Sequence, residues 1–154
     1  MQENRIIVFG IGSNLGNRKA FIKLAIDMLR QRLLLNNIKK SSMIENPAML
    51  LPDSPKEWDK DFMNIVICAD IDLTKFSPID ILKIIKNIEI DLGREVKHKW
   101  APREIDIDIL AIDDMKIDFD EKLTIPHKGL FQRDFFINGF KEIAPELFLK
   151  IKIN

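Results

Sequence analysis

The sequence contains the stretch Ile105-Asp106-Ile107-Asp108-Ile109-Leu110-Ala111-Ile112, in which isoleucine and aspartate alternate before a fully apolar end. Successive side chains of a β-strand point to opposite faces of a sheet. The stretch therefore predicts a strand with both aspartates on one face and isoleucines on the other. Two neighbouring carboxylates repel each other, and a divalent cation between them relieves this repulsion. Mg²⁺ suits the pair because it prefers oxygen ligands and is commonly held by one or two carboxylates plus substrate phosphates.

A basic segment leads directly into this acidic strand. By spacing alone, a solvated strand face is a commoner explanation of the aspartates than a metal site. However, residues 93–103 place two arginines, two lysines and a histidine just before them. Guanidinium groups and metal ions together can hold a polyphosphate from both sides. The alternative for this segment is a solvated basic loop. Trp100 could stack on a nucleotide base, although a core position is the more common place for tryptophan.

The rest of the chain predicts strands interleaved with helices. Periodicity and turn residues predict strands over 5–11, 39–44, 62–71 and 115–117. Helices are predicted over 18–35, where Asn17 is the N-cap, and over 78–92, which lies between Ser77 and Gly93. A third helix is predicted over 130–143 and is closed by Pro145. A long loop with three prolines is expected over 45–61. This order favours an α+β sandwich with a mixed sheet.

Composition and charge restrict the class of protein. The 154 residues are 46% hydrophobic and 31% charged, which predicts one soluble domain over 1–154. The formal net charge is zero, so no global field attracts nucleic acid or a membrane surface. The single cysteine, Cys68, indicates a reducing compartment. With no apolar run long enough to span a bilayer, we expect a cytoplasmic protein that binds neither nucleic acid nor membrane.

Several common motifs are excluded. In Gly10-Ile11-Gly12-Ser13-Asn14-Leu15-Gly16 the third glycine falls one position too late for the dinucleotide-binding pattern. The P-loop, the nucleophile elbow and zinc-binding spacings do not occur. His127 and Arg133 could each reach a phosphate, but a lone histidine is more often structural. Phe135 and Phe136 are more often core residues than a ligand platform, although one of them could stack on a flat heterocycle.

Four segments together resemble the 6-hydroxymethyl-7,8-dihydropterin pyrophosphokinase family. They are the glycine-rich stretch 10–16, Phe62-Met63-Asn64, the run from Trp100 to Asp108, and Pro126-His127 with Arg133, Phe135 and the stretch 142–145. The third segment is the most specific. A tryptophan, proline and arginine at this spacing before the two aspartates are unlikely to arise by chance beside the other three segments. The resemblance covers nearly the whole chain.

The resemblance implies a fold and a reaction. The fold is a ferredoxin-like α+β structure, a three-layer α/β/α sandwich with a mixed, mainly antiparallel sheet. The reaction transfers diphosphate from ATP to the hydroxymethyl group of 6-hydroxymethyl-7,8-dihydropterin, giving AMP, in folate biosynthesis. Two Mg²⁺ ions are implied as cofactors, with ATP as co-substrate. The sequence permits either a free-standing protein or a segment fused to another folate enzyme.

The resemblance also implies roles for individual residues. Asp106 and Asp108 match magnesium ligands, and Arg94 and Arg103 match catalytic arginines that hold phosphates. Further nucleotide contacts are implied for Glu89, Trp100, Ile109, His127 and Arg133. The pterin contacts are implied for Asn46, Met49, Phe62, Asn64 and Phe135. The loop over 45–61 is longer than in compact family members, and Lys128-Gly129 stands where proline is frequent.

Two other functions fit part of the sequence. The same nucleotide and magnesium site could transfer a single phosphoryl group to another small alcohol, which would give ADP. Alternatively, the architecture could serve as a binding module for RNA or protein, because it hosts many functions. The charge balance and the lack of exposed aromatic residues patterned along the strands argue against RNA.

Overall fold

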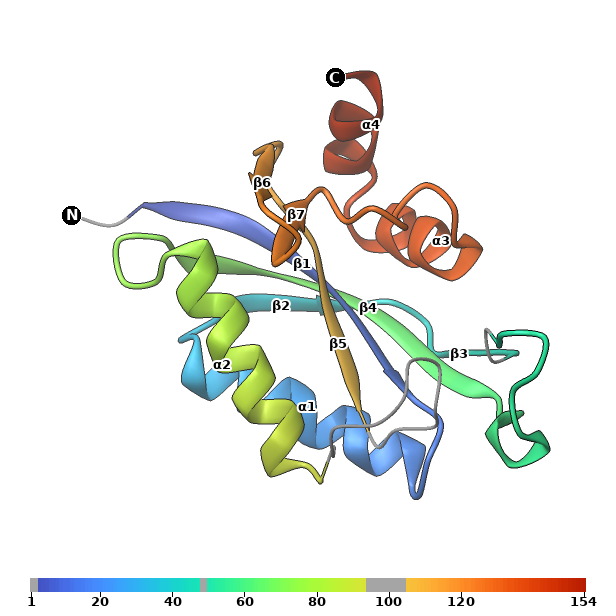
Figure 1. Ribbon diagram of the computed structural model, residues 1–154. Coiled ribbons are helices and arrows are strands. Elements are labelled where there is room, and N and C mark those ends of the chain that lie inside the picture. The colour runs from blue at the N-terminus through green and yellow to red at the C-terminus, as the bar shows by residue number, and fades with distance from the viewer. Residues whose placement is uncertain (1–2, 48–49, 94–104) are drawn as a thin grey trace.

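The computed structural model of the protein describes residues 3–47, 50–93 and 105–154 (Figure 1). Its main sheet has the strand order β2-β4-β1-β5. A further strand, β3, also pairs with β4, along a different part of that strand from β2. The strands are β1 (Asn4–Ser13), β2 (Asn36–Lys40), β3 (Ile44–Asn46), β4 (Phe62–Asp72) and β5 (Asp106–Ile112). Every pairing among these described strands is antiparallel. A separate hairpin joins β6 (Ile117–Phe119) to β7 (Leu123–Ile125).

Helices cover both faces of the sheet. Figure 1 places α1 (Arg18–Arg32) and α2 (Pro78–Asp91) on one face and α3 (Asp134–Ile143) with α4 (Pro145–Ile153) on the other. A short 3₁₀ turn, η1 (Lys56–Trp58), interrupts the loop before β4. The order β1-α1-β2/β3-β4-α2-β5 with this strand arrangement is ferredoxin-like. The predicted three-layer α+β sandwich is therefore confirmed. The sheet was expected to be mixed, but the pairings among its described strands are all antiparallel, because α1 and α2 each join two strands that have another strand between them.

The two faces of the sheet form two hydrophobic cores. Along β1, Ile7, Phe9 and Ile11 pack with α1 and α2, whereas Val8 packs with α3 and α4. Along β4, odd-numbered residues such as Ile65 and Ile67 join the first core, and Val66 and Cys68 join the second. This alternation follows from the period of two in a strand. Cys68 is buried in the second core, and burial raises the pKa of its thiol.

Helix boundaries follow the capping signals closely. The Asn17 side chain accepts a hydrogen bond from the N–H of Ala20 at 3.2 Å and begins α1. Ser77 and Asp80 form a reciprocal capping box at the start of α2. Gly93, at φ 100°, follows the end of α2 as predicted.

Other boundaries differ from the predictions. The single strand expected over 39–44 is instead two strands, β2 and β3, with residues 41–43 between them. The last predicted helix begins at Asp134 rather than at Leu130, because residues 127–133 form turns. The short strand predicted over 115–117 lies instead at 117–119. The end of the last predicted helix at Ile143, before Pro145, agrees with the prediction. Pro145 also begins α4, a helix for which there was no prediction. None of the helices in the described ranges has the length and apolar character needed to cross a bilayer.

Candidate active site

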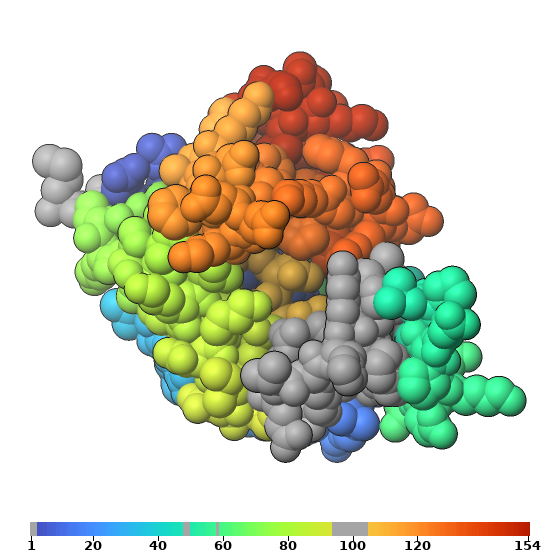
Figure 2. Space-filling model, in the orientation of Figure 1, coloured from blue at the N-terminus to red at the C-terminus, as the bar shows by residue number. Residues whose placement is uncertain are grey.

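Polar residues and glycines gather at one end of the sheet face that carries α3. Where α3 and α4 cover this face, the sheet presents Val8, Val66 and Leu110 to the second core. Towards the ends of β1, β4 and β5 the same face presents Gly12, Asn64 and Asp106, which lie in one row because Gly12 pairs with both of the others. In Figure 2 the gold of β5 lies at the floor of a hollow between the orange segment after β7 and the yellow-green of α2.

The two aspartates lie on this face with the predicted alternation. Asp106 and Asp108 are half-buried, and Ile107 between them is buried in the core against α1 and α2. Their cross-strand neighbours are glycines, since Asp106 pairs with Gly12 and Asp108 with Gly10. Glycine has no side chain to occupy the space in front of its strand neighbour. The two carboxylates therefore share one side of the sheet, as the sequence predicted.

His127 lies against Asp108. The N–H of His127 donates to the carbonyl of Leu110 at 3.0 Å, which holds the segment after β7 along β5. The imidazole Nε2 then lies 3.5 Å from Asp108 Oδ1. On its other side, Nδ1 accepts a hydrogen bond from the N–H of Gly129 at 2.9 Å. Since Nδ1 is an acceptor, the ring proton of the neutral form is on Nε2 and faces the carboxylate.

Asp108 is held in its charged form. Burial by itself would raise the pKa of Asp108, but the hydrogen bond from His127 and the nearby charges of His127 and Arg133 outweigh it, so that the pKa lies below its ordinary value. Arg133 is the N-cap residue of α3, and its guanidinium carbon lies 5.2 Å from the ring centroid of Phe136. The site thus combines an ionised carboxylate with the cationic side chain of Arg133 at one end of the sheet.

Glu89 holds the outer edge of β5. Its side chain is 2% exposed on α2, and Oε2 accepts a hydrogen bond from the backbone N–H of Ile107 at 2.9 Å. The other carboxylate oxygen lies 3.4 Å from Lys86 Nζ. A strand edge carries N–H groups without a neighbouring strand, and burial makes a partner necessary. Glu89 supplies that partner midway between the two aspartates.

A second cluster lies beside the aspartates, at the junction of β3 and β4. Asn64 is buried, and its Nδ2 donates to Asn46 Oδ1 at 3.0 Å. Gly12 makes this arrangement possible, since a Cβ there would lie 2.6 Å from Asn64 Oδ1 and 3.2 Å from a ring carbon of Phe62. The cluster therefore presents amide groups and one aromatic ring next to the backbone of Gly12, which has no side chain.

Two phenylalanines at the start of α3 lie beside His127. Phe136 is buried, and its ring lies edge-on to His127, with 5.4 Å between centroids. Phe135 is half-buried and packs on Phe136, with 4.6 Å between centroids. The first turn of α3 thus carries an aromatic pair beside the histidine.

The family model of 7,8-dihydro-6-hydroxymethylpterin-pyrophosphokinase (HPPK) matches residues 8–145, which is most of the chain. The chain belongs to the HPPK family. This assignment agrees with the resemblance that the sequence motifs indicated.

Named relatives of the chain include separate HPPK proteins and bifunctional ones. A pyrophosphokinase of Aquifex aeolicus is 37% identical over 141 residues, which cover 92% of this chain and 81% of the relative. A second pyrophosphokinase, from Methylorubrum extorquens, is 33% identical, and the aligned region covers 82% of that relative. The folate synthesis bifunctional protein of Chlamydia muridarum is 38% identical over 95% of this chain, but this chain spans only 32% of its length.

The fold agrees with solved structures of the same family. The chain superposes with a TM-score of 0.63 on the crystal structure of wild-type Plasmodium falciparum HPPK-DHPS with pterin and p-hydroxybenzoate. The alignment covers 95% of this chain and 40% of the larger one, at 17% sequence identity. At that identity the comparison supports the fold alone.

The structure brings together many of the residues that the sequence assigned to the HPPK site. On the α3 face of the sheet lie Asp106, Asp108, Asn46, Phe62 and Asn64, and the segment from His127 to Phe135 lies beside them. The predicted roles of Arg94, Trp100, Arg103 and Met49 fall outside the described residues. Ile109 is buried in the core against α1 and α2, and Glu89 contacts β5. Their nucleotide contacts remain predictions.

Two features of the site were not found from the sequence. The role of Glu89 at the edge of β5 depends on a contact between α2 and a strand, which no local pattern reveals. The anchoring of the loop before β4 is also new. Asn14 Nδ2 donates to the carbonyl of Lys60 at 3.1 Å, and Arg18 donates to the carbonyl of Asp61 at 3.1 Å while pairing with Glu45. These bonds fix the end of that loop beside the asparagine cluster.

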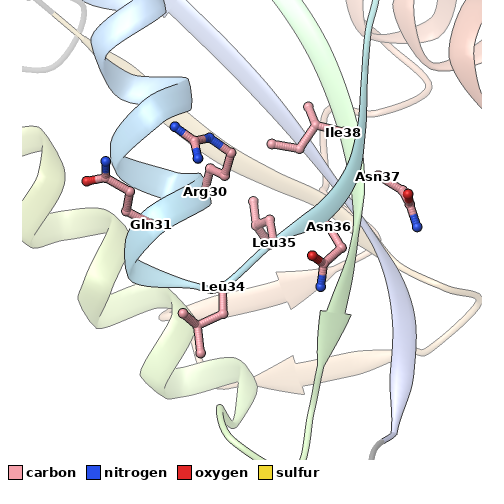
Figure 3. Close-up of a pocket in the computed structure, with 7 residues that line it drawn as sticks. All are labelled: Arg30, Gln31, Leu34, Leu35, Asn36, Asn37 and Ile38. Atoms are coloured by element: carbon pink, nitrogen blue, oxygen red, sulfur yellow. The ribbon is translucent and has the colours of Figure 1, made fainter.

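A pocket of about 690 Å³ lies elsewhere, between the end of α1 and β2 (Figure 3). Arg30, Leu34 and Asn37 are among the residues that line it, and none of the predicted site residues within the described ranges lines it. This pocket has no convergent charged groups of the kind that phosphate binding requires. The predicted site residues Asp106, Asp108 and Asn64 lie instead on the α3 face of the sheet.

Proposed function

We propose that this HPPK domain transfers diphosphate from ATP to the hydroxymethyl group of 6-hydroxymethyl-7,8-dihydropterin, releasing AMP. The observation that carries the proposal is the sharing of one sheet face by the Asp106-Asp108 pair and the Asn46-Asn64-Phe62 cluster. The first group suits a polyphosphate with its cations, and the second suits a flat heterocycle with hydrogen-bonding edges. Their adjacency fits a transfer between the two substrates.

The aspartate pair fits the proposed magnesium ions by its chemistry. Within the described ranges there is no group of three or more histidine, cysteine or carboxylate side chains that could enclose a metal. Mg²⁺ is usually bound by one or two carboxylates, with the remaining ligands from water and substrate phosphates. Asp106 and Asp108 would hold the ions, which when bound neutralise phosphate charge as it develops. The lowered pKa of Asp108 supports its role as an anionic ligand.

The remaining residues of the chain would orient the two substrates. Arg133 and His127 stand beside Asp108 and would contact phosphate oxygens. Asn64 and Asn46 would hydrogen-bond the pterin edge, and Phe62 and Phe135 would contact its faces. Catalysis of phosphoryl-type transfer rests mainly on alignment and charge neutralisation. This division of labour needs no strongly basic side chain at the hydroxyl.

Product analysis tests the proposal. Purified protein is incubated with ATP, Mg²⁺ and 6-hydroxymethyl-7,8-dihydropterin, and nucleotides are separated by chromatography. The proposal predicts AMP and pterin diphosphate in equal amounts, and no AMP when the pterin is omitted. Release of ADP with a pterin monophosphate would instead support single phosphoryl transfer. Absence of any pterin-dependent ATP turnover would contradict both.

The proposal concerns the activity of this chain. A second folate-pathway activity in the same polypeptide, as the name of the chlamydial relative indicates for that protein, is compatible with it. A cytoplasmic setting is proposed as well, because ATP is the co-substrate and Cys68 is a buried free thiol.

A further inference from the structure

The connection between β2 and β3 contains an extra residue. Lys40 pairs with Ile67 on β4, and Ile44 pairs with Asn64, so four steps along one strand match three steps along β4. An inserted residue of this kind is a bulge, and a shift by one residue exchanges the two faces of a strand. Residues 41–43 therefore determine that the side chain of Asn46 lies on the face of Asn64.

Ser41 attaches this connection to β4. Its N–H donates to the carbonyl of Val66 at 2.8 Å, and the N–H of Val66 donates back to Ser41 Oγ at 2.9 Å. The same hydroxyl donates to the carbonyl of Ser42 at 2.9 Å. The backbone of the bulge is thus closed by a buried serine, and the next residue is directed outward.

Ser42 is bound by the far end of α3. Glu142 Oε2 accepts a hydrogen bond from the N–H of Ser42 at 2.5 Å, and Oε1 accepts one from Ser42 Oγ at 2.6 Å. Both carboxylate oxygens are used, and such charge-assisted bonds are stronger than neutral ones. The pKa of Glu142 lies below its ordinary value because of the bonds from the Ser42 hydroxyl and N–H.

Close packing of α3 makes this contact possible. Gly139 is buried, and a Cβ at that position would lie 2.5 Å from Val66 Cγ2 and 3.3 Å from Ser41 Oγ. The helix backbone therefore rests directly on β4 and on the bulge. Phe135 lies one turn before Gly139 on the same helix. A single helix thus carries Phe135 near one end and the Ser42 contact near the other.

We propose that the contact between Glu142 and Ser42 positions the two walls of the pterin site. It fixes α3, which carries Phe135, to the bulge that sets the register of β3, which carries Asn46. Glu142 acts through Ser42 and does not itself contact substrate. This inference rests on the proposed function, because it assigns the pterin to the space between those walls.

The test compares Glu142→Ala, Glu142→Gln and Ser42→Ala with the parent protein. Glu146→Ala, an exposed glutamate on the neighbouring helix α4, is the matched control. Steady-state KM values for the pterin and for ATP are measured, together with pterin titrations in the presence of Mg²⁺ and a non-hydrolysable ATP analogue. Thermal midpoints are recorded for every variant.

For Glu142→Ala we expect the pterin KM and Kd to rise by about threefold to tenfold. The KM for ATP should change by less than about twofold, because Asp106, Asp108 and His127 lie outside α3 and β3, and Arg133 lies at the opposite end of α3 from Glu142. Glu142→Gln keeps one acceptor oxygen and should fall between parent and Ala. Ser42→Ala keeps the backbone bond and should also be intermediate. The double variant of Ser42→Ala and Glu142→Ala should show less than the sum of the two effects.

Other outcomes overturn the inference. Unchanged pterin affinity in Glu142→Ala, or equal increases in both KM values with a lower thermal midpoint, would mean that the contact is merely structural. Either result with an active parent leaves the proposed function intact. A parent protein that neither forms AMP nor binds the pterin would overturn the proposed function, and this inference with it.

Discussion

The carboxylate of Glu89 accepts a hydrogen bond from the backbone N–H of Ile107, at 2.9 Å, midway between Asp106 and Asp108. The bond joins α2 to the outer edge of β5, and the Glu89 side chain is 2% exposed. The two aspartates therefore depend on a buried group that lies on the opposite side of the sheet from their own side chains. The positions of the two aspartates are set by the contact of Glu89 with the outer edge of β5 as well as by the pairing of β5 with β1.

Replacing Glu89 distinguishes a structural role at the edge of β5 from a direct contact with the nucleotide. Glu89→Ala leaves the N–H of Ile107 without its acceptor, which should lower the free energy of unfolding by about 1–3 kcal/mol in urea titrations. Glu89→Gln retains an acceptor oxygen and should lose less. If Glu89 instead serves as a direct nucleotide contact, Gln will raise the KM for ATP while stability stays near that of the parent. Lys86→Ala, at an exposed partner, should change stability by less than about 0.5 kcal/mol.

Replacing either aspartate should stop the reaction without unfolding the protein. Asp106→Ala and Asp108→Ala each remove a proposed metal ligand from a half-buried cleft position. We expect turnover to fall by roughly a thousandfold or more, with an unchanged far-ultraviolet circular dichroism spectrum. Asp118→Asn, at an exposed position on β6, should behave as the parent. Near-parental activity in either alanine variant would contradict the metal role.

Two glycines of β1 should respond differently to alanine. At Gly12 a methyl group would meet the end of the Asn64 side chain at 2.6 Å. The amide can move aside, so Gly12→Ala should cause little loss of stability. It should raise the pterin KM by about tenfold or more, because one polar contact to the pterin is then misplaced. At Gly10 the methyl would meet the buried ring of Phe136 at 2.6 Å, so Gly10→Ala should destabilise the fold by about 1–3 kcal/mol. Equal loss of stability in both variants would contradict this distinction.

Acid should weaken the contact between Glu142 and Ser42. The ordinary pKa of glutamate is 4.5, and the folded pKa of Glu142 lies below it. The unfolded state therefore binds more protons between these two values, and stability rises with pH there. The contribution is fully present above about pH 4.5 and is lost as pH falls through the folded pKa. The difference in urea midpoint between the parent and Glu142→Gln should accordingly shrink from pH 6 to pH 3. A pH-independent difference would exclude the ionic contact.

The strands and helices with strong local signals could be predicted from the sequence. The alternation of residues 105–112 gave the correct strand and the correct face for both aspartates, because one face is buried and the other is not. The first two helices were predicted from their caps, since Asn17 and the Ser77-Asp80 pair act within three or four residues. The site residues came from family motifs. Strand pairing places Asp106, Asp108 and Asn64 on one face, whereas Ile109 faces the opposite core.

The errors came from interactions between distant segments. The break between β2 and β3 depends on Ser41 contacting Val66 and on Ser42 contacting Glu142, which is 100 residues away. No local pattern carries that information. Pro145 follows the end of α3, as predicted, and also occupies the first position of α4, a second use that the local pattern did not indicate. Residues 130–133 match helical periodicity but form turns from His127 and Gly129.

A crystal structure with Mg²⁺, a non-hydrolysable ATP analogue and 6-hydroxymethyl-7,8-dihydropterin tests the central claim most directly. The account predicts metal-bound phosphates over Asp106 and Asp108. It also predicts the pterin ring between Phe62 and Phe135, with its edge at the Asn46-Asn64 pair. A nucleotide bound instead in the pocket between α1 and β2, or phosphates with no aspartate oxygen near their cations, would contradict it.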